Sequence, residues 1–334
     1  MQIIQNEKQK AFFFLLNANL IWGITPIFLE VILKYFSPLQ AVTLRFGIAA
    51  VTLSFILYIS RGRKAFSFLF MKNVIILGWL DALGYLAATV GQDMSTAGLA
   101  TLLSSFYVFI VPFIAWRLED AEINMKLVFT GSISLIGVFL ISFNGDWTNL
   151  TKSSMFGVLI LIFSAIMWGF YTVLTGNFLK LSKLKDEKVD LLNFTSASIF
   201  HTFLVLSFIS FVVAEPIIIF PLEIIPIILF LGLVPTIFAL SLWNWAIARL
   251  GAVDTSFIQL LQLVVPFILE FILFQQSYTV WIYSGISLIL ISSVWMTEGA
   301  LSSNKSRKNK PDKLLTLESM SSKITNANLN SCCS

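Results

Sequence analysis

Apolar residues follow one another along this chain in runs of roughly 20, the length that an α-helix needs to cross a bilayer. The runs are continuous rather than alternating, and short polar stretches separate them, so the pattern favours membrane-spanning helices over strands. We predict ten spans, at about residues 11–33, 39–60, 73–91, 98–116, 127–143, 155–175, 191–213, 223–246, 253–274 and 278–297.

The pattern also repeats within the chain. A shift of 154 residues places the run Val111–Ile114 on Val265–Ile268, and near the start of each half the shift is 146 residues, from Trp22 to Trp168. Each half would hold five spans, and an odd number forces the second copy into the bilayer upside down. The predicted fold is therefore an all-α membrane protein with ten transmembrane helices arranged as two inverted five-helix repeats, a plan typical of secondary transporters.

These boundaries divide the chain into five segments. We predict a cytoplasmic N-terminus (1–10), a first five-helix repeat (11–143), an outer linker (144–154), a second five-helix repeat (155–297) and a disordered cytoplasmic tail (298–334). The tail is rich in Lys, Ser and Asn, which cannot bury enough apolar surface to fold alone. The two cysteines of the chain, Cys332 and Cys333, lie in this tail and cannot staple the fold.

Composition and charge place the protein in a membrane. The chain is 57% hydrophobic and 12% charged, with a mean hydropathy of +0.87, outside the range of soluble domains. Most Lys and Arg residues fall in loops on one side, which the positive-inside rule assigns to the cytoplasm. The net charge of +4 therefore reflects topology, and we expect no nucleic-acid partner. We predict a multi-pass protein of the cell membrane, surrounded by lipid bilayer, with both termini cytoplasmic.

Several short motifs occur in order along both halves. They are Trp22-Gly23, Ser37-Pro38, Arg45-Phe46, Pro112 with Glu122, Leu231–Val234, Leu242–Ala246, Leu250–Ala252 and Pro266. Together with the repeat, they resemble the EamA-type family of the drug/metabolite transporter superfamily over nearly all of residues 11–298. The resemblance implies alternating-access transport of a small metabolite such as an amino acid, a nucleoside or a cationic or zwitterionic compound, without a cofactor.

Polar residues inside the predicted spans mark the candidate site, because a charged side chain at the centre of a membrane helix is unfavourable by at least ~2.5–3.5 kcal/mol. At 100° per residue, such residues form stripes on several helices, and these stripes would line one amphipathic cavity. The candidate substrate-binding residues are Trp22, Glu30, Arg45, Asp81, Tyr85, Trp168, Tyr171, Asn244, Gln259, Gln262 and Glu270. Two prolines inside spans, Pro112 and Pro266, are the candidate hinges. No metal site is expected.

Other roles stay open for some of these residues. Arg45, the one basic residue within a predicted span, could instead be a structural partner of Glu30 or of an outer-loop carbonyl. Glu30 and Glu270 could lie at the interface, and the tryptophans could fill the core. Asp81 would lie roughly 12 Å inside its span, so it must be paired, wetted by a cavity or protonated. Proton coupling and a homodimer are both compatible with the sequence.

Two other function classes compete with transport. An intramembrane enzyme would need a nucleophile–base pair or metal ligands, but the chain has one histidine and lacks the His-Glu-x-x-His and Gly-x-Ser-x-Gly patterns. It also lacks the P-loop pattern, which excludes transport driven by ATP hydrolysis on this chain. A membrane sensor would need an output domain, which the tail is too short to form. The histidine, His201, lies in segment 191–213, where we predict no site residue.

Overall fold

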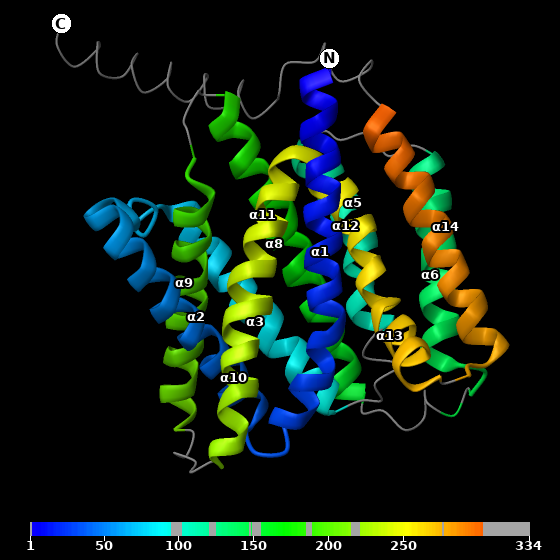
Figure 1. The fold of residues 1–334 in the computed structure, drawn as a ribbon, viewed down its shortest axis with the longest axis horizontal. Helices are drawn as coiled ribbons and strands as arrows, with labels where there is room; N and C mark the ends of the chain where they lie inside the picture. Colours follow the sequence, from blue (N-terminus) through cyan, green and yellow to red (C-terminus); the bar gives the residue numbers. More distant parts are fainter. Residues whose placement is uncertain are drawn as a thin grey trace, which may run out of the picture.

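The computed structural model describes residues 2–94, 102–119, 125–146, 148, 155–184, 189–214, 221–275 and 277–302 (Figure 1). Helices make up nearly all of this part, and no strand occurs in it, so the all-α prediction is confirmed. Most of the predicted linker and the tail beyond residue 302, with Cys332 and Cys333, lie outside the described residues.

The helices lie side by side, with α2 and α9 at one edge of the view and α6 and α14 at the other (Figure 1). They are α1 (Gln2–Ile32), α2 (Pro38–Arg61), η1 (Gly62–Phe66), α3 (Lys72–Asp93), α5 (Tyr107–Glu119), α6 (Met125–Phe143), α8 (Met155–Leu184), α9 (Leu191–Val213), η2 (Leu222–Ile224), α10 (Ile225–Leu231), the π-helix η3 (Gly232–Phe238), α11 (Ala239–Leu250), α12 (Ala252–Gln259), η4 (Leu260–Leu263), α13 (Val265–Phe274) and α14 (Val280–Ser302).

Seven helical stretches of the described chain are long and apolar enough to cross a membrane: Asn6–Ile32, Pro38–Phe66, Lys72–Asp93, Met125–Phe143, Met155–Lys180, Leu191–Val213 and Leu222–Leu250. Two shorter apolar helices are Leu102–Leu118 and Val280–Trp295. The remaining predicted span, 253–274, is divided among α12, η4 and α13. The ten-span count and the inversion of the halves therefore stay predictions.

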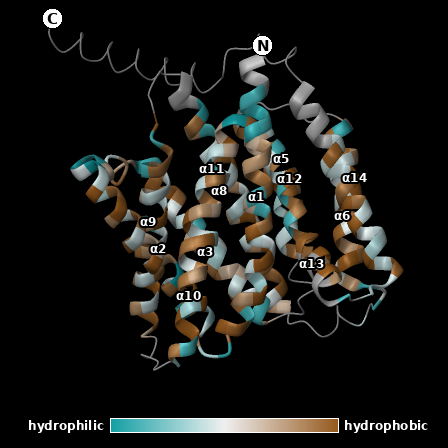
Figure 2. Cartoon of the chain, in the orientation of Figure 1, coloured by the Kyte–Doolittle hydropathy of each residue, from teal (hydrophilic) through white to brown (hydrophobic). Residues whose placement is uncertain are grey.

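The outer surface of the helices is apolar and polar residues lie inside, the reverse of a soluble protein. Phe55 is 63% exposed and Phe211 is 84% exposed, whereas Asp81 and Asn244 are buried. Figure 2 shows hydrophobic residues along the helices and hydrophilic ones near many of their ends. Large exposed apolar surfaces are rare in soluble proteins, so lipid is the solvent that fits these helices.

The end of the molecule where α1 begins is here called the N-terminal face, and the other end the opposite face. At the opposite face, α1 turns into α2 through a capping box, in which Ser37 and Gln40 each bond the other's backbone N–H at 3.1 Å. An apolar cluster covers this turn, in which Ile32 and Phe36 pack with Ile228 of α10. This cluster joins the first half of the chain to the second.

Helices α6 and α14 cross at two glycines. A Cβ on Gly137 would lie 2.8 Å from the carbonyl oxygen of Gly285, and one on Gly285 would lie 2.5 Å from that of Gly137. Small residues at such crossings let backbones pack closely, which stabilises helix pairs in lipid.

We therefore expect Gly137→Val to lower stability by about 1–3 kcal/mol, because the added side chain would push α14 away from α6. Thermal unfolding of the purified protein in detergent measures this effect. The control is Ile136→Val on the same helix, where the side chain is 52% exposed. Equal midpoints for the two variants would contradict the close crossing.

Candidate functional site

Asp81 is a carboxylate buried at the interface of two helices. It lies in the middle of α3, is 2% exposed, and accepts a hydrogen bond of 3.2 Å from the Thr202 hydroxyl of α9. Within the described chain, no Lys or Arg lies within ion-pair distance of it. Asp81 therefore combines deep burial with a single hydroxyl partner, which leaves much of its hydrogen-bonding capacity unused.

Arg45 lies near this carboxylate and is 6% exposed. Its Nε donates to the Thr236 hydroxyl of η3 at 2.6 Å, and its guanidinium carbon lies 5.0 Å from the centre of the Tyr85 ring. This contact is a cation–π interaction between α2 and α3. Among the described residues, no ion pair joins Arg45 to Glu30, which is exposed on α1.

Aromatic rings extend the site from Asp81 towards α8. Tyr85, one turn after Asp81, packs edge-on against Phe46 at 5.0 Å and against Trp168 at 5.3 Å. Trp168 approaches this closely because Gly84 has no side chain: a Cβ there would lie 2.7 Å from the indole. Tyr85 and Trp168 are half-buried, so they bring flat apolar surfaces beside the buried charges. Such a combination suits a small polar or cationic ligand.

A second aromatic group lies on α1, α8 and α11. Tyr171 stacks on Trp243 at 5.8 Å, and Trp22 lies 6.4 Å from Trp243. The Trp22 indole N–H donates to the Pro235 carbonyl, and that of Trp243 donates to the Gln259 side chain, both at 2.9 Å. These rings therefore connect three of the predicted site residues with α11 and the π-helix η3.

The π-helix η3 places a backbone distortion beside Arg45. The shift of 154 residues, from Val111 to Val265, also places Asp81 on Pro235 in the middle of η3. The Thr236 hydroxyl donates to the Leu231 carbonyl five residues earlier and accepts from Arg45. Single-turn π-helices occur frequently at functional sites.

The predicted polar stripe on segment 253–274 is wrong in one respect. We expected one continuous helix with a polar stripe of Thr255, Gln259, Gln262, Pro266 and Glu270, but the 3₁₀ turn η4 at Leu260–Leu263 interrupts that helix. Proline at the start of α13 explains the break, because it has no N–H for the preceding turn. Gln259 and Gln262 are half-buried, and the side chains of Pro266 and Glu270 lie outside the described part.

The same break occurs in the first half. Helix 102–119 is interrupted by a turn at Phe106, six residues before the buried Pro112. The shift of 154 residues places Phe106 on Leu260, where η4 begins. Both prolines thus follow an interrupted helix at corresponding positions of the two halves, and discontinuous helices of this kind point to binding sites in transporters.

Comparison with known proteins decides the family. The profile of the EamA-like transporter family matches the chain twice, over residues 9–143 and 155–297. The chain belongs to the EamA-like transporter family. This family is part of the drug/metabolite transporter superfamily.

Relatives of this EamA protein carry transporter names. The chain is 25% identical over 296 residues to the uncharacterized transporter YoaV of Bacillus subtilis (strain 168), covering 87% of this chain and 97% of YoaV. An uncharacterized transporter of Archaeoglobus fulgidus is 26% identical over 251 residues, which cover 74% of this chain and 83% of that protein. A solved crystal structure superimposes with a TM-score of 0.70 at 14% identity, covering 87% of this chain and 98% of that one, which shows a shared fold.

Sequence reasoning missed the polar residues of α9 in this EamA protein. Thr195, Ser198 and Thr202 are each fully buried, and Thr202 is the hydrogen-bond partner of Asp81. Their spacing of three and four residues places them on one helix face, a signal that the sequence contains. His201 is turned elsewhere, since its Nε2 lies 2.6 Å from the Leu69 carbonyl.

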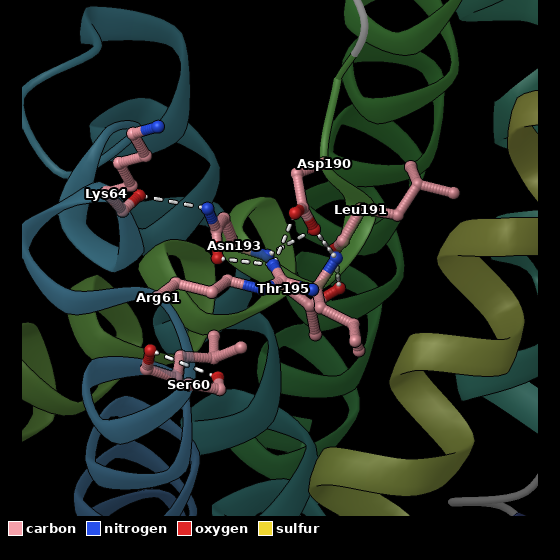
Figure 3. A network of polar contacts seen from close by, with 9 residues as sticks. Ser60, Arg61, Lys64, Asp190, Leu191, Asn193 and Thr195 are labelled. Carbon is pink, nitrogen blue, oxygen red and sulfur yellow. Dashed lines mark hydrogen bonds and ion pairs between the residues drawn. The ribbon is translucent and has the colours of Figure 1, made fainter.

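In the described part of the EamA protein, two ion pairs connect the halves at the N-terminal face. The first joins Arg61, at the end of α2, to Asp190, which caps the N-terminus of α9 (Figure 3). Arg61 also donates to the Asn193 side chain at 2.8 Å, and Asn193 in turn donates to the Lys64 carbonyl at 3.0 Å. This network ties α2 and η1 of the first half to α9 of the second.

The second ion pair joins α1 to α11. Arg249 Nε lies 3.1 Å from a carboxylate oxygen of Glu7, and its guanidinium carbon lies 3.3 Å from the centre of the Trp245 ring. Because the α1–α2 turn is at the opposite face, the start of α1 and the end of α2 share the N-terminal face, and so do both ion pairs.

Acidification should weaken the Arg61 contact. Burial acts to raise the pKa of Asp190, but hydrogen bonds from Arg61 and from the Asn193 and Leu192 backbones outweigh it and hold the pKa below its ordinary value. In the unfolded chain the pKa of Asp190 is about 3.9, and in the folded protein it is lower. The ionised carboxylate therefore stabilises the fold above about pH 3.9, and this stabilisation is lost as the pH falls towards the folded-state pKa.

Between about pH 4 and pH 3, the unfolding midpoint should therefore fall further in wild type than in Asp190→Asn. Asparagine keeps the helix cap and removes only the charge. We expect the difference in pH-dependent unfolding free energy between the two proteins to be less than about 1 kcal/mol, because the Asp190 side chain is 40% exposed. Parallel pH curves for the two proteins would contradict this role.

Proposed function

We propose that this EamA protein is a secondary active transporter that moves a small polar metabolite across the cell membrane by alternating access. The observation that carries the proposal is the buried pair of unlike charges, Asp81 and Arg45, which lies beside Tyr85 and Trp168 and is not joined in an ion pair. Charges held apart in a membrane interior are available to a ligand that carries the complementary groups.

These groups favour particular classes of substrate. A carboxylate and a guanidinium suit a zwitterion such as an amino acid, and the aromatic rings add cation–π and stacking surfaces for a cationic compound or a nucleoside. Coupling to protons at Asp81 is one form of the proposal. The topology that goes with it has ten spans, inverted halves, and the N-terminal face with both termini in the cytoplasm.

Counterflow tests transport directly. Proteoliposomes loaded with one unlabelled metabolite at a time are diluted into the same labelled metabolite, drawn from sets of amino acids, nucleosides and amines. Accumulation of label above that of empty liposomes supports the proposal. Lack of accumulation for every set, with correctly folded protein, favours the two competing classes, an intramembrane enzyme or a sensor.

Cysteine accessibility tests the orientation. In a background that lacks Cys332 and Cys333, cysteines at Thr148 and Lys310 should react with an impermeant maleimide from outside and from inside the cell, respectively. Labelling of the first from inside, or of the second from outside, would contradict the proposed topology.

A further inference from the structure

A line of buried polar side chains leads from Asp81 towards the N-terminal face. Thr202, Ser198 and Thr195 supply it from one face of α9, and all three are fully buried. Helix α8 adds Tyr171 and Thr175. Helix α11 adds Asn244, whose side chain donates to the Thr195 hydroxyl at 2.9 Å. We name these six residues the hydroxyl seam: Thr202, Ser198, Tyr171, Thr175, Thr195 and Asn244.

Most members of the seam lack a hydrogen-bond partner for a buried atom. In the described chain, the hydroxyls of Tyr171, Thr175 and Ser198 and the side-chain oxygen of Asn244 are all inaccessible and unbonded. The Tyr171 hydroxyl is near enough to those of Ser198 and Thr175 to interact with them, but without hydrogen-bond geometry. Buried polar atoms without a partner are rare in proteins, and ordered water is the usual partner where several of them lie close together.

The seam runs along the axis of α9. At 1.5 Å per residue, Thr195 lies roughly 7 Å from Asp190 at the N-terminal face, and Thr202 lies roughly 10 Å further along. Figure 3 shows Thr195 beside the network of Arg61, Asp190 and Asn193. At the other end, Thr202 donates to the Asp81 carboxylate. The seam thus extends from the buried acid to within roughly 7 Å of Asp190 at the N-terminal face.

Among the residues that the structure describes, none near Asp81 supplies a second carboxylate. The charged or titratable groups near it are Arg45 from α2, Tyr171 from α8 and Tyr85 on α3 itself. Helix α9 faces it with Thr202, while His201 bonds to the Leu69 carbonyl. Hydroxyls and water can each accept a proton while donating another, so they can pass protons along a line without any net change.

We propose that the hydroxyl seam holds ordered water and carries protons between the N-terminal face and the Asp81 carboxylate. A proton that arrives at Thr202 or at its neighbouring water is transferred to a carboxylate oxygen of Asp81, and the reverse transfer regenerates the carboxylate. This inference rests on the proposed function, in which Asp81 belongs to the transport site. It adds the route by which Asp81 would be protonated and deprotonated.

Accessibility of a matched pair of serines tests for water in the seam. Ser198 and Ser196 lie two residues apart on α9 and are 0% and 4% exposed, but Ser196 lies off the seam, where its hydroxyl is 3.3 Å from that of Ser54. In the Cys332→Ser, Cys333→Ser background, Ser198→Cys and Ser196→Cys are treated with Ag⁺, and the remaining thiols are counted with a maleimide after denaturation. A thiol reacts as thiolate, which needs water.

We expect Ag⁺ to block the thiol of Ser198→Cys at least tenfold faster than that of Ser196→Cys. The reaction should occur only when Ag⁺ reaches the N-terminal face, which is the outer face of inside-out vesicles in the proposed topology. Equal rates, or a reaction solely from the opposite face, would overturn the proposal. If Ser198→Cys does not fold, Thr175→Cys on α8 is expected to give the same result.

Infrared spectroscopy tests delivery to Asp81 without any transported metabolite. In reconstituted protein at acidic pH, the carboxyl band of Asp81 is identified by its absence in Asp81→Asn, and its shift is followed after transfer to D₂O. We expect the shift to be at least tenfold slower in Tyr171→Phe/Ser198→Ala than in wild type, and Ser196→Ala to match wild type. An unaltered rate in the double variant overturns the proposal, whereas failure of counterflow alone would overturn the transport function and leave this result standing.

Discussion

Replacing Asp81 by asparagine is expected to abolish proton-coupled transport, or transport of a cationic substrate, while the protein still folds in the membrane. Asn has nearly the same shape and still offers an oxygen to the Thr202 hydroxyl, so the α3–α9 contact is kept. It removes the negative charge that would hold a proton or a substrate amine. A hydrogen bond to a charged group contributes about 1.5–3 kcal/mol, so loss of this contact alone should lower the rate or affinity at least roughly 10- to 100-fold.

Stability should change in the other direction. A buried carboxylate without a fixed cation is unfavourable in the folded state, and the amide relieves that desolvation. We therefore expect the thermal midpoint of Asp81→Asn in detergent to equal or exceed that of wild type. Counterflow and the thermal midpoint, measured on the same preparation, separate loss of function from loss of fold.

Asp93→Asn is the matched control for this substitution. Asp93 ends the same helix but is exposed, so its neutralisation should leave transport unchanged. If Asp81→Asn transports at the wild-type rate with the wild-type pH dependence, Asp81 is a structural residue.

Replacing Pro112 or Pro266 by alanine is expected to slow turnover about tenfold while the half-saturation concentration stays within about twofold. Each proline follows a helix break, at Phe106 and at Leu260–Leu263. Alanine restores the missing N–H and favours helical backbone, by up to about 3 kcal/mol in a helix interior. A segment that bends during alternating access would then be held in one conformation.

The proline at Pro38 provides the comparison. It occupies the first turn of α2, where a proline interrupts no hydrogen bond, so Pro38→Ala should leave turnover close to wild type. Initial rates of counterflow over a range of substrate concentrations give both constants. A large loss of affinity with normal turnover at saturation would contradict the hinge role.

Sequence reasoning located the helices and the charges but not the contacts between them. Continuous apolar runs predict membrane helices because lipid offers no partner to backbone groups. Depth in its segment was enough to single out Asp81. The partner of Arg45 could not be predicted, because Thr236 lies beside it in the π-helix η3, and no local sequence pattern predicts a π-helix there.

The missed residues of α9 have a different cause. Serine and threonine bond readily to their own helix, as Thr195 does to the Leu191 carbonyl, so a single one in a membrane helix is weak evidence for a site. Thr195, Ser198 and Thr202 form a continuous buried polar line only because α9 packs against α3, α8 and α11. Likewise, Arg61 and Asp190 lie 129 residues apart, and nothing in either segment predicts that they meet.

Different interactions join the two halves at the two faces of the molecule: ion pairs at one and an apolar cluster at the other. Under the proposed alternating-access cycle, its two reorientation steps should therefore respond to different variables. Separation of the halves at the N-terminal face breaks the half-exposed ion pairs of Arg61 and Arg249, which dissolved salt screens. Separation at the opposite face exposes Ile32, Phe36 and Ile228 to water, which raises the heat capacity. Ionic strength should therefore change the rate of one reorientation step, while the other step should show a curved dependence on temperature.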